Sequence, residues 1–241
     1  MSSFFGEVRI KGTEEGSVAK STLWAAIAVV FGVLIFDQVL KIWIKTNMSL
    51  GQEHEVFGNE IDGYWFIIHF TENNGMAFGL EFGGEIGKIL LSVFRIVAVS
   101  AIGYYLVTYA RKGAKIGLII AGSLIFSGAM GNIIDSAFYG LIFNESHDQI
   151  AEFMPAEGGY APFLYGRVVD MLYFPLIKGT FPDWMPIWGG ENFLFFRPVF
   201  NIADTAISVG IGMIILFQKR WFEEEEEDNA ESKTKASEIN N

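Results

Sequence analysis

Residues 116–135 read IGLIIAGSLIFSGAMGNIID, an apolar run that carries no charge before its last residue, Asp135. A helix needs about 20 predominantly apolar residues to cross a hydrocarbon core of roughly 30 Å. The stretch therefore predicts a membrane-spanning helix whose final turn brings Asn132 and Asp135 to one end of the span.

Three further windows have the length and apolar character of a span: 23–44, 89–110 and 198–218. The first contains Asp37 and Lys41 but continues apolar to Ile44, and no small-residue cleavage site follows it. We therefore expect a retained span and not a signal peptide. The chain is 51% hydrophobic although its net charge is -11, so apolar and acidic segments are separate, as is typical of a membrane protein.

Lys and Arg lie before the first window, between the second and third, and after the fourth, which predicts that both termini are cytoplasmic. The outer connections are then 46–88 and 136–197, and the first contains a β-prone stretch, YWFIIHFT at 64–71. We expect an all-α membrane fold: a four-helix transmembrane bundle with a small extracytoplasmic β-rich element and extended outer loops. Residues 1–22 form a cytoplasmic extension, 23–218 the membrane domain, and 219–241 an acidic tail predicted to be disordered.

Two classes of chemistry are disfavoured by composition. The chain has no cysteine, which excludes disulfides and thiolate nucleophiles, and its three histidines, His54, His69 and His147, lack the spacing of metal ligands. We therefore expect neither a metal nor a cofactor.

Polar residues from all four predicted spans fall at the same outer depth. Ionisable groups are costly in hydrocarbon and normally face a bundle interior or a wet cavity, so this coincidence indicates a functional site. Taken singly, Asp37 with Lys41 could be a structural ion pair, and Arg95 could extend towards the interface. The residues in question are Asp37, Lys41, Arg95, Asn132, Asp135, Asn201 and Asp204.

Three aspartates are candidates for chemistry at this depth: Asp135, Asp170 and Asp204. The first and last follow an asparagine by three residues, a spacing that puts amide and carboxylate on one helix face. Two close carboxylates do not both ionise readily, so one keeps a proton while the other acts as base towards water. This favours an aspartic peptidase. A small ion or proton transporter using the same buried acids is the alternative from another class, and a structural membrane scaffold is a third.

Five motifs occur in order along the chain, and together they resemble those of the lipoprotein signal peptidase (signal peptidase II) family. Asp37-Gln38-Val39-Leu40-Lys41 is similar to its Asp-Gln-x-x-Lys, Asn73-Asn74-Gly75-Met76-Ala77-Phe78 to Asn-x-Gly-Ala-Ala-Phe, Gly131-Asn132-Ile133-Ile134-Asp135 to Gly-Asn-x-x-Asp, Val168-Val169-Asp170 to Val-Val-Asp, and Phe200-Asn201-Ile202-Ala203-Asp204 to Phe-Asn-x-Ala-Asp.

The resemblance implies cleavage of diacylglyceryl-modified prolipoproteins before the lipidated cysteine, at the outer face of the bacterial cytoplasmic (inner) membrane. It implies Asp170 and Asp204 as the catalytic pair and no cofactor. The expected partners are these precursors and membrane lipid, with no nucleic acid. By the same resemblance, substrate-binding or site-supporting roles fall to Asp37, Lys41, Asn73, Gly75, Asn132, Asp135 and Asn201.

The chain departs from the family pattern at several places. Ser136 stands where the family has Arg after Gly-Asn-x-x-Asp, and Met171 stands where it has Phe after Val-Val-Asp. Two outer segments, 139–165 and 171–197, are enlarged and are expected to reshape the substrate entrance. A cation that substitutes for the missing Arg would come from Arg95, Arg167 or Arg197.

Overall fold

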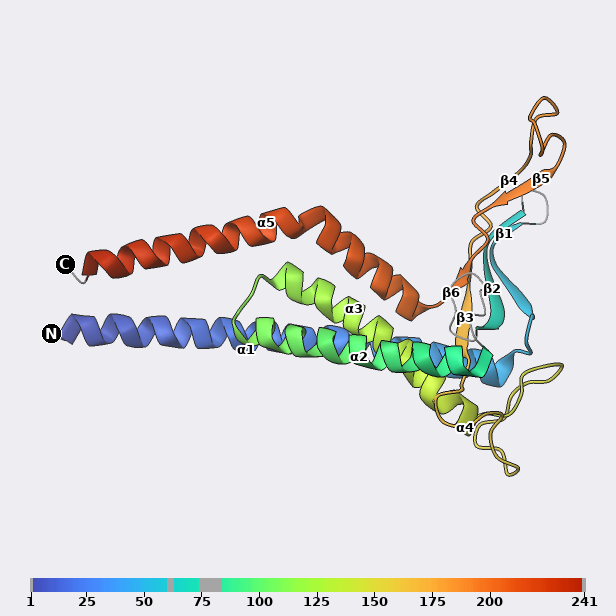
Figure 1. Ribbon diagram of the computed structural model, residues 1–241, viewed down its shortest axis with the longest axis horizontal. Helices are drawn as coiled ribbons and strands as arrows, with labels where there is room; N and C mark the ends of the chain where they lie inside the picture. The colour runs from blue at the N-terminus through green and yellow to red at the C-terminus, as the bar shows by residue number, and fades with distance from the viewer. Residues whose placement is uncertain (1, 60–62, 74–83, 240–241) are drawn as a thin grey trace. The chain divides into compact units, whose positions relative to one another are not determined.

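The computed structural model describes residues 2–59, 63–73 and 84–239 (Figure 1). Its long helices are α1 (Ser2–Asn47), α2 (Gly84–Arg111), α3 (Ile116–Ile134) and α5 (Ile202–Ile239). The chain divides into two compact units: residues 1–35, 95–130 and 203–241 form the first, and residues 36–94 and 131–202 form the second.

The four predicted spans are confirmed. The helical stretches Val18–Asn47, Ile89–Arg111, Ile116–Ile142 and Ile202–Trp221 are each long and apolar enough to cross a membrane. They carry large apolar side chains that are exposed on the protein surface, among them Phe94 at 68% and Leu216 at 76%. Such a surface is unfavourable in water and suits lipid, so the chain is a multi-pass membrane protein.

The first unit packs its helices through small residues, as membrane helices commonly do. Thr22 donates a 2.8 Å hydrogen bond to the Ala110 carbonyl oxygen. A Cβ atom on Gly128 would lie 2.2 Å from the Ala203 carbonyl oxygen, and one on Gly210 would lie 2.7 Å from that of Ala121. Only glycine allows these backbones to approach so closely.

The third span ends later, and the fourth span begins later, than the sequence predicts. The third span does not end at Asp135, because a π-helix, η2 (Asp135–Tyr139), and the short α4 (Gly140–Ile142) continue it. The fourth begins at Ile202 instead of 198, because β6 (Val199–Phe200) pairs with another strand before the helix starts. π-Helices are rare in proteins as a whole, and those that occur are often at functional sites. Here the π-helix contains the buried residues Asp135 and Tyr139.

Helix α5 continues through the acidic tail to Ile239. The sequence predicts disorder there because acidic and other polar residues dominate the tail from Glu223 onward. Its Glu, Ala and Lys residues have high intrinsic helix propensity, which accounts for the helical backbone.

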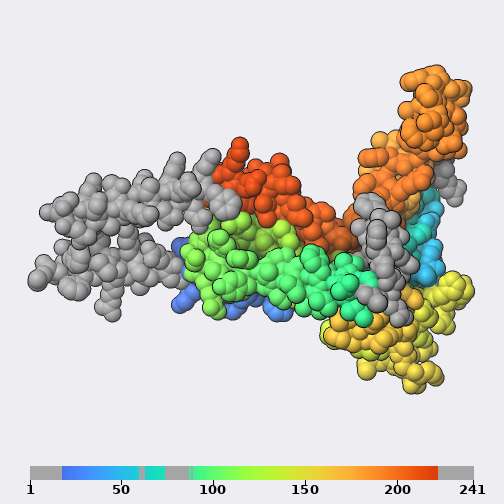
Figure 2. All heavy atoms as spheres, in the orientation of Figure 1, coloured from blue at the N-terminus to red at the C-terminus, as the bar shows by residue number. Residues whose placement is uncertain are grey.

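The second unit is built on an antiparallel sheet with the order β1-β2-β3-β6, in which β1 is Glu53–Asn59, β2 is Gly63–Asn73 and β3 is Val168–Tyr173. Strand β2 contains the predicted β-prone stretch 64–71 and confirms the β-rich element. A separate hairpin, β4 (Ile177–Thr180) and β5 (Asn192–Phe195), forms its own lobe of the surface, in orange in Figure 2.

Strand β3 is held in the sheet by neighbours on both sides. Asp170 lies opposite Thr71 of β2, and Leu172 lies opposite Phe200 of β6. Its Val169 and Met171 side chains are fully buried in an apolar cluster together with Phe70 and Tyr139. The strand that carries Asp170 is therefore fixed by both backbone pairing and burial.

The approach to β3 depends on one glycine. The Gly166 amide donates to the Ser136 carbonyl oxygen at 2.8 Å, and a Cβ atom on Gly166 would lie 2.2 Å from the Asp135 carbonyl oxygen. Any side chain here must push the chain away from η2.

Gly166→Ala should therefore lower the melting temperature measured in detergent micelles, since forcing atoms into a packed site costs about 1–3 kcal/mol. Gly32→Ala is the matched control: its Cβ atom would meet nothing within 4 Å, and alanine is favoured over glycine in a helix. Equal melting temperatures for wild type and Gly166→Ala would refute the close approach.

Candidate active site

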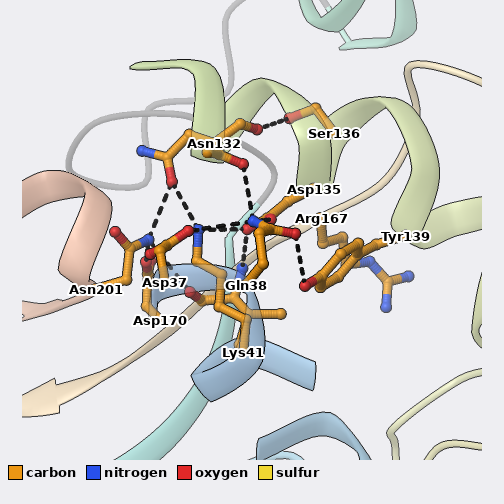
Figure 3. Close-up of polar contacts among 12 residues, drawn as sticks. Asp37, Gln38, Lys41, Asn132, Asp135, Ser136, Tyr139, Arg167, Asp170 and Asn201 are labelled. Carbon is orange, nitrogen blue, oxygen red and sulfur yellow. Dashed lines mark hydrogen bonds and ion pairs between the residues drawn. The ribbon is translucent and has the colours of Figure 1, made fainter. Parts of the chain in front are cut away.

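A buried lysine lies at the centre of the polar cluster in the second unit. The Lys41 Nζ atom lies 2.8 Å from an oxygen of Asp37, one helical turn earlier, and 2.8 Å from an oxygen of Asp135 (Figure 3). It also donates to Asn132 Oδ1 at 3.1 Å. Asp37, Lys41 and Asp135 are each 1% exposed or less, so their charges are compensated by one another and not by water.

Gln38 supplies further hydrogen bonds to the carboxylates of this cluster. Its side-chain amide donates to Asp135 Oδ1 at 2.9 Å and to Asp37 Oδ2 at 3.2 Å. Its Oε1 accepts a hydrogen bond from the hydroxyl of Tyr139, at 3.1 Å. Neither Gln38 nor Tyr139 was among the predicted site residues, although Gln38 belongs to the first quoted motif.

Asp135 connects the cluster to strand β3. Its Oδ2 atom accepts the backbone N–H of Val169 at 3.2 Å, one residue before Asp170. One carboxylate thus contacts α1 through Lys41 and Gln38, and β3 through the backbone. The predicted sharing of one face by Asn132 and Asp135 is consistent with their common partner, Lys41.

Asn201 holds Asp170. Its side-chain amide donates to Asp170 Oδ1 at 2.7 Å, to the Val169 carbonyl oxygen at 3.2 Å and to Asn132 Oδ1 at 3.2 Å. Asn201 is fully buried and Asp170 is 5% exposed. Asn201 lies one residue before helix α5, so Asn201 and Asp204 do not share a helix face as predicted; the Asn201 amide contacts Asp170 of β3 instead.

The structure therefore joins six of the nine predicted site residues in one network: Asp37, Lys41, Asn132, Asp135, Asp170 and Asn201. Asn73 ends strand β2 opposite Val168, two residues before Asp170. Asp204 lies in the first turn of α5, within the first unit. Gly75 lies outside the described residues.

A second ionic cluster, which the sequence did not reveal, lies beside the same strands. Glu72 of β2 forms ion pairs with Lys45 and with Arg167, the latter at 2.9 Å. Arg167 also contacts Glu145 at 2.8 Å, and Ser146 donates to Glu72 at 3.1 Å. The cluster links the end of α1, strand β2 and the enlarged segment that leads into β3.

Aromatic rings enclose the two cations of this cluster. The Lys45 Nζ atom lies 5.2 Å from the ring centroids of both Phe143 and Tyr160, and the Arg167 guanidinium lies 4.8 Å from that of Tyr160. Cation–π contacts of this kind favour charged groups that have lost water. At the position of the family Arg, the Ser136 hydroxyl donates to the Asn132 carbonyl oxygen at 3.1 Å.

Electrostatics keeps Glu72 ionised. Burial alone would raise the pKa of its carboxyl group, but the adjacent Lys45 ammonium and the hydrogen bonds from Lys45 and Arg167 outweigh burial and hold that pKa below its usual range. The pairing is therefore a source of stability that depends on pH.

In the part of the chain that the structure describes, no group of three or more His, Asp or Glu side chains is arranged to hold a metal ion. The polar groups of the two clusters are carboxylates, side-chain amides, hydroxyls, the Arg167 guanidinium and the buried ammonium groups of Lys41 and Lys45.

The spans and the buried carboxylate network describe a multi-pass membrane protein of the kind seen in two solved bacterial membrane enzymes. One has a TM-score of 0.54 at 26% sequence identity, and its alignment covers 81% of this chain and 87% of that structure's chain. The other has a TM-score of 0.51 at 27% identity and covers 79% and 90%.

Sequence comparison gives the family. The family model described as "Signal peptidase (SPase) II" matches residues 29–219. A lipoprotein signal peptidase of Porphyromonas gingivalis is 51% identical over 194 residues, which cover 80% of this chain and 82% of that protein. One of Amoebophilus asiaticus is 37% identical over 195 residues, covering 80% and 77%. This chain belongs to the signal peptidase II family.

The second ionic cluster predicts a pH-dependent stability. Because the folded pKa of Glu72 is depressed, its ion pairs stabilise the protein above the unfolded pKa of about 4.3, and this contribution is lost as the pH falls through the folded pKa. Glu72→Gln should melt below wild type at neutral pH, and the difference should shrink in acid.

Glu145→Gln is the control for this measurement, since the Glu145 side chain pairs with the same Arg167 but is 46% exposed. Exposed pairs contribute little, so its effect should be smaller. A Glu72→Gln deficit that is the same at pH 7 and at pH 3 would contradict the pairing.

Proposed function

We propose that this protein is an intramembrane aspartyl endopeptidase that removes signal peptides from diacylglyceryl-modified prolipoproteins, cutting before the lipidated cysteine. Membership of the signal peptidase II family supports the substrate class. The single observation that carries the choice of chemistry is the 2.7 Å hydrogen bond from Asn201 to the buried carboxylate of Asp170.

Asp170 and Asp204 are the proposed catalytic pair. Asn201 contacts Asp170 and precedes Asp204 by three residues, and three residues of chain span at most about 10 Å. Covalent geometry thus limits how far the Asp204 backbone can lie from Asn201, the residue that contacts Asp170. The same two aspartates occupy the Val-Val-Asp and Phe-Asn-x-Ala-Asp motifs of this sequence.

The reaction needs one ionised and one protonated carboxyl group. Two nearby carboxylates do not both ionise readily, and the pair titrates as a unit. The ionised member takes a proton from water, whose oxygen bonds to the scissile carbonyl carbon. The protonated member donates its proton to the carbonyl oxygen, which gives a diol. The C–N bond then breaks as the leaving nitrogen takes up the proton held by the first carboxyl group, and one hydroxyl of the diol returns its proton to the second, so the product is a carboxylic acid and the pair is restored.

The remaining members of the buried network act as positioning residues in this proposal. Asp135 holds the Val169 amide and is itself held by Lys41 and Gln38. Asn132 links Lys41 to Asn201, so the amide that holds Asp170 is oriented from the other side. Carboxylates fixed in this way need no reorganisation when charge develops in the transition state.

The proposed site lies at a depth in the membrane that suits a lipidated substrate. With four spans both termini lie on one side, and the Lys and Arg residues that flank the spans favour the cytoplasm for that side. The site then lies near the outer face of the bacterial inner membrane. There the acyl chains of a lipidated precursor remain in hydrocarbon while the adjacent peptide bond meets water.

Asp170→Asn and Asp204→Asn should each reduce cleavage at least about 100-fold, because each removes one proton carrier. The assay is release of signal peptide from a diacylglyceryl-modified precursor, followed by mass spectrometry on purified protein in detergent. Asp148→Asn is the control, since the Asp148 side chain is 89% exposed and lies outside the network.

Unchanged melting temperatures would show that the Asn variants remain folded. Substantial cleavage by either of them would overturn the assignment of the pair, and absence of cleavage by wild type would overturn the proposed activity.

A further inference from the structure

The β4–β5 hairpin exposes a group of large apolar side chains that no described part of the protein covers. Trp184 is 79% exposed, Ile187 is 85% exposed and Trp188 is 50% exposed, all at the tip between the two strands. More than half of the residues from 174 to 196 are large and apolar. A contiguous apolar surface of this kind marks an interaction site.

The tip is an ordered structure. The Phe181 amide donates to the Glu191 carbonyl oxygen at 2.9 Å, and the Gly190 amide donates to the Phe181 carbonyl oxygen at 3.0 Å. The Phe181 ring packs against Phe193, with centroids 4.8 Å apart. The hairpin thus has its own small core, which the Trp188 ring joins with its centroid 6.3 Å from that of Phe181.

Ile187 has an unusual backbone conformation. Its φ angle is +77°, in the left-handed region that a β-branched residue rarely occupies. Strain of this kind persists where the surrounding structure enforces it and is concentrated at functional positions. Here it presents the most exposed of the large apolar side chains at the tip.

Two cations accompany the apolar residues. Lys178 and Arg197 line a shallow pocket of about 500 Å³ on the hairpin, next to Phe193 and Leu194. Cations above an apolar floor match the phosphate and the upper acyl chain of a phospholipid. Over 174–197 the two cations balance Asp183 and Glu191, so the hairpin carries no net charge to repel the anionic phosphates.

The hairpin cannot lie far from the bilayer. Strand β5 ends at Phe195 and the fourth membrane span begins at Ile202, and seven residues of chain reach at most about 25 Å. Trp residues are enriched where membrane proteins meet the lipid headgroups. By contrast, the enlarged segment 139–165 has four acidic residues and no Lys or Arg.

We propose that the β4–β5 hairpin is a lipid anchor: Trp184, Ile187 and Trp188 enter the boundary of the outer leaflet, and Lys178 and Arg197 bind phospholipid phosphates. Along the chain, the anchor lies between strand β3 and the fourth span, and it attaches this connection to the membrane surface. This proposal does not depend on the peptidase reaction and is tested without it.

The absence of cysteine makes the test direct, because one introduced cysteine is the only label site. Ile187→Cys carries a nitroxide in protein reconstituted into phosphatidylethanolamine and phosphatidylglycerol bilayers. Accessibility to oxygen, which concentrates in lipid, is compared with accessibility to a water-soluble nickel chelate. Glu157→Cys is the control, an exposed position in the acidic segment.

The label at 187 should be several-fold less accessible to nickel than the label at 157 and more accessible to oxygen. Equal nickel accessibility at the two positions would overturn the anchor. Protection from both reagents would also overturn it, since it would indicate a protein surface such as a second copy of the chain. In the Lys178→Gln, Arg197→Gln double variant, the label at 187 should become more accessible to nickel. Unchanged nickel accessibility would overturn the proposed phosphate contacts of Lys178 and Arg197.

Discussion

The buried Lys41 ammonium is the interaction on which the site depends. It compensates Asp37 and Asp135 within the protein and contacts Asn132, so α1, the end of the third span and the amide network meet at one atom. A charge buried in this way is costly unless it is fully paired, and removing one partner leaves the others uncompensated. The position of Asp170 depends on these contacts in turn. Asp135 accepts a hydrogen bond from the Val169 amide, and Asn132 accepts one from Asn201, which contacts Asp170.

Much of the fold could be predicted from the sequence because its signals are local. Twenty-residue apolar windows indicated the four spans, and the run at 64–71 indicated strand β2. The motif residues indicated most of the network. The pairing of Glu72 with Lys45 and Arg167 could not be predicted, because its members lie 27 and 95 positions apart and follow no period. The π-helix and strand β6 depend on tertiary contacts, so the ends of two spans were misplaced.

The two ionic clusters and the hairpin fit one physical picture of the enzyme that we propose. Both clusters hold strand β3 in place. In one, Asp135 accepts a hydrogen bond from the Val169 amide of the strand; in the other, Glu72 pairs with Arg167, which directly precedes the strand. Peptide hydrolysis requires water at a site whose substrate is anchored in lipid. A rigid strand carrying one carboxylate, next to a surface that binds the headgroup region, would hold the reacting bond at that boundary.

The pairing of Asp170 with Asp204 is the central claim, and thiol bridging measures it most directly. In a chain without cysteine, the Asp170→Cys, Asp204→Cys double variant offers two thiols to a short bifunctional thiol reagent applied to membranes. If the two residues face each other, intact-protein mass spectrometry will show one reagent bridging both thiols within a single chain. Two separately modified thiols with no bridged product would contradict the pairing.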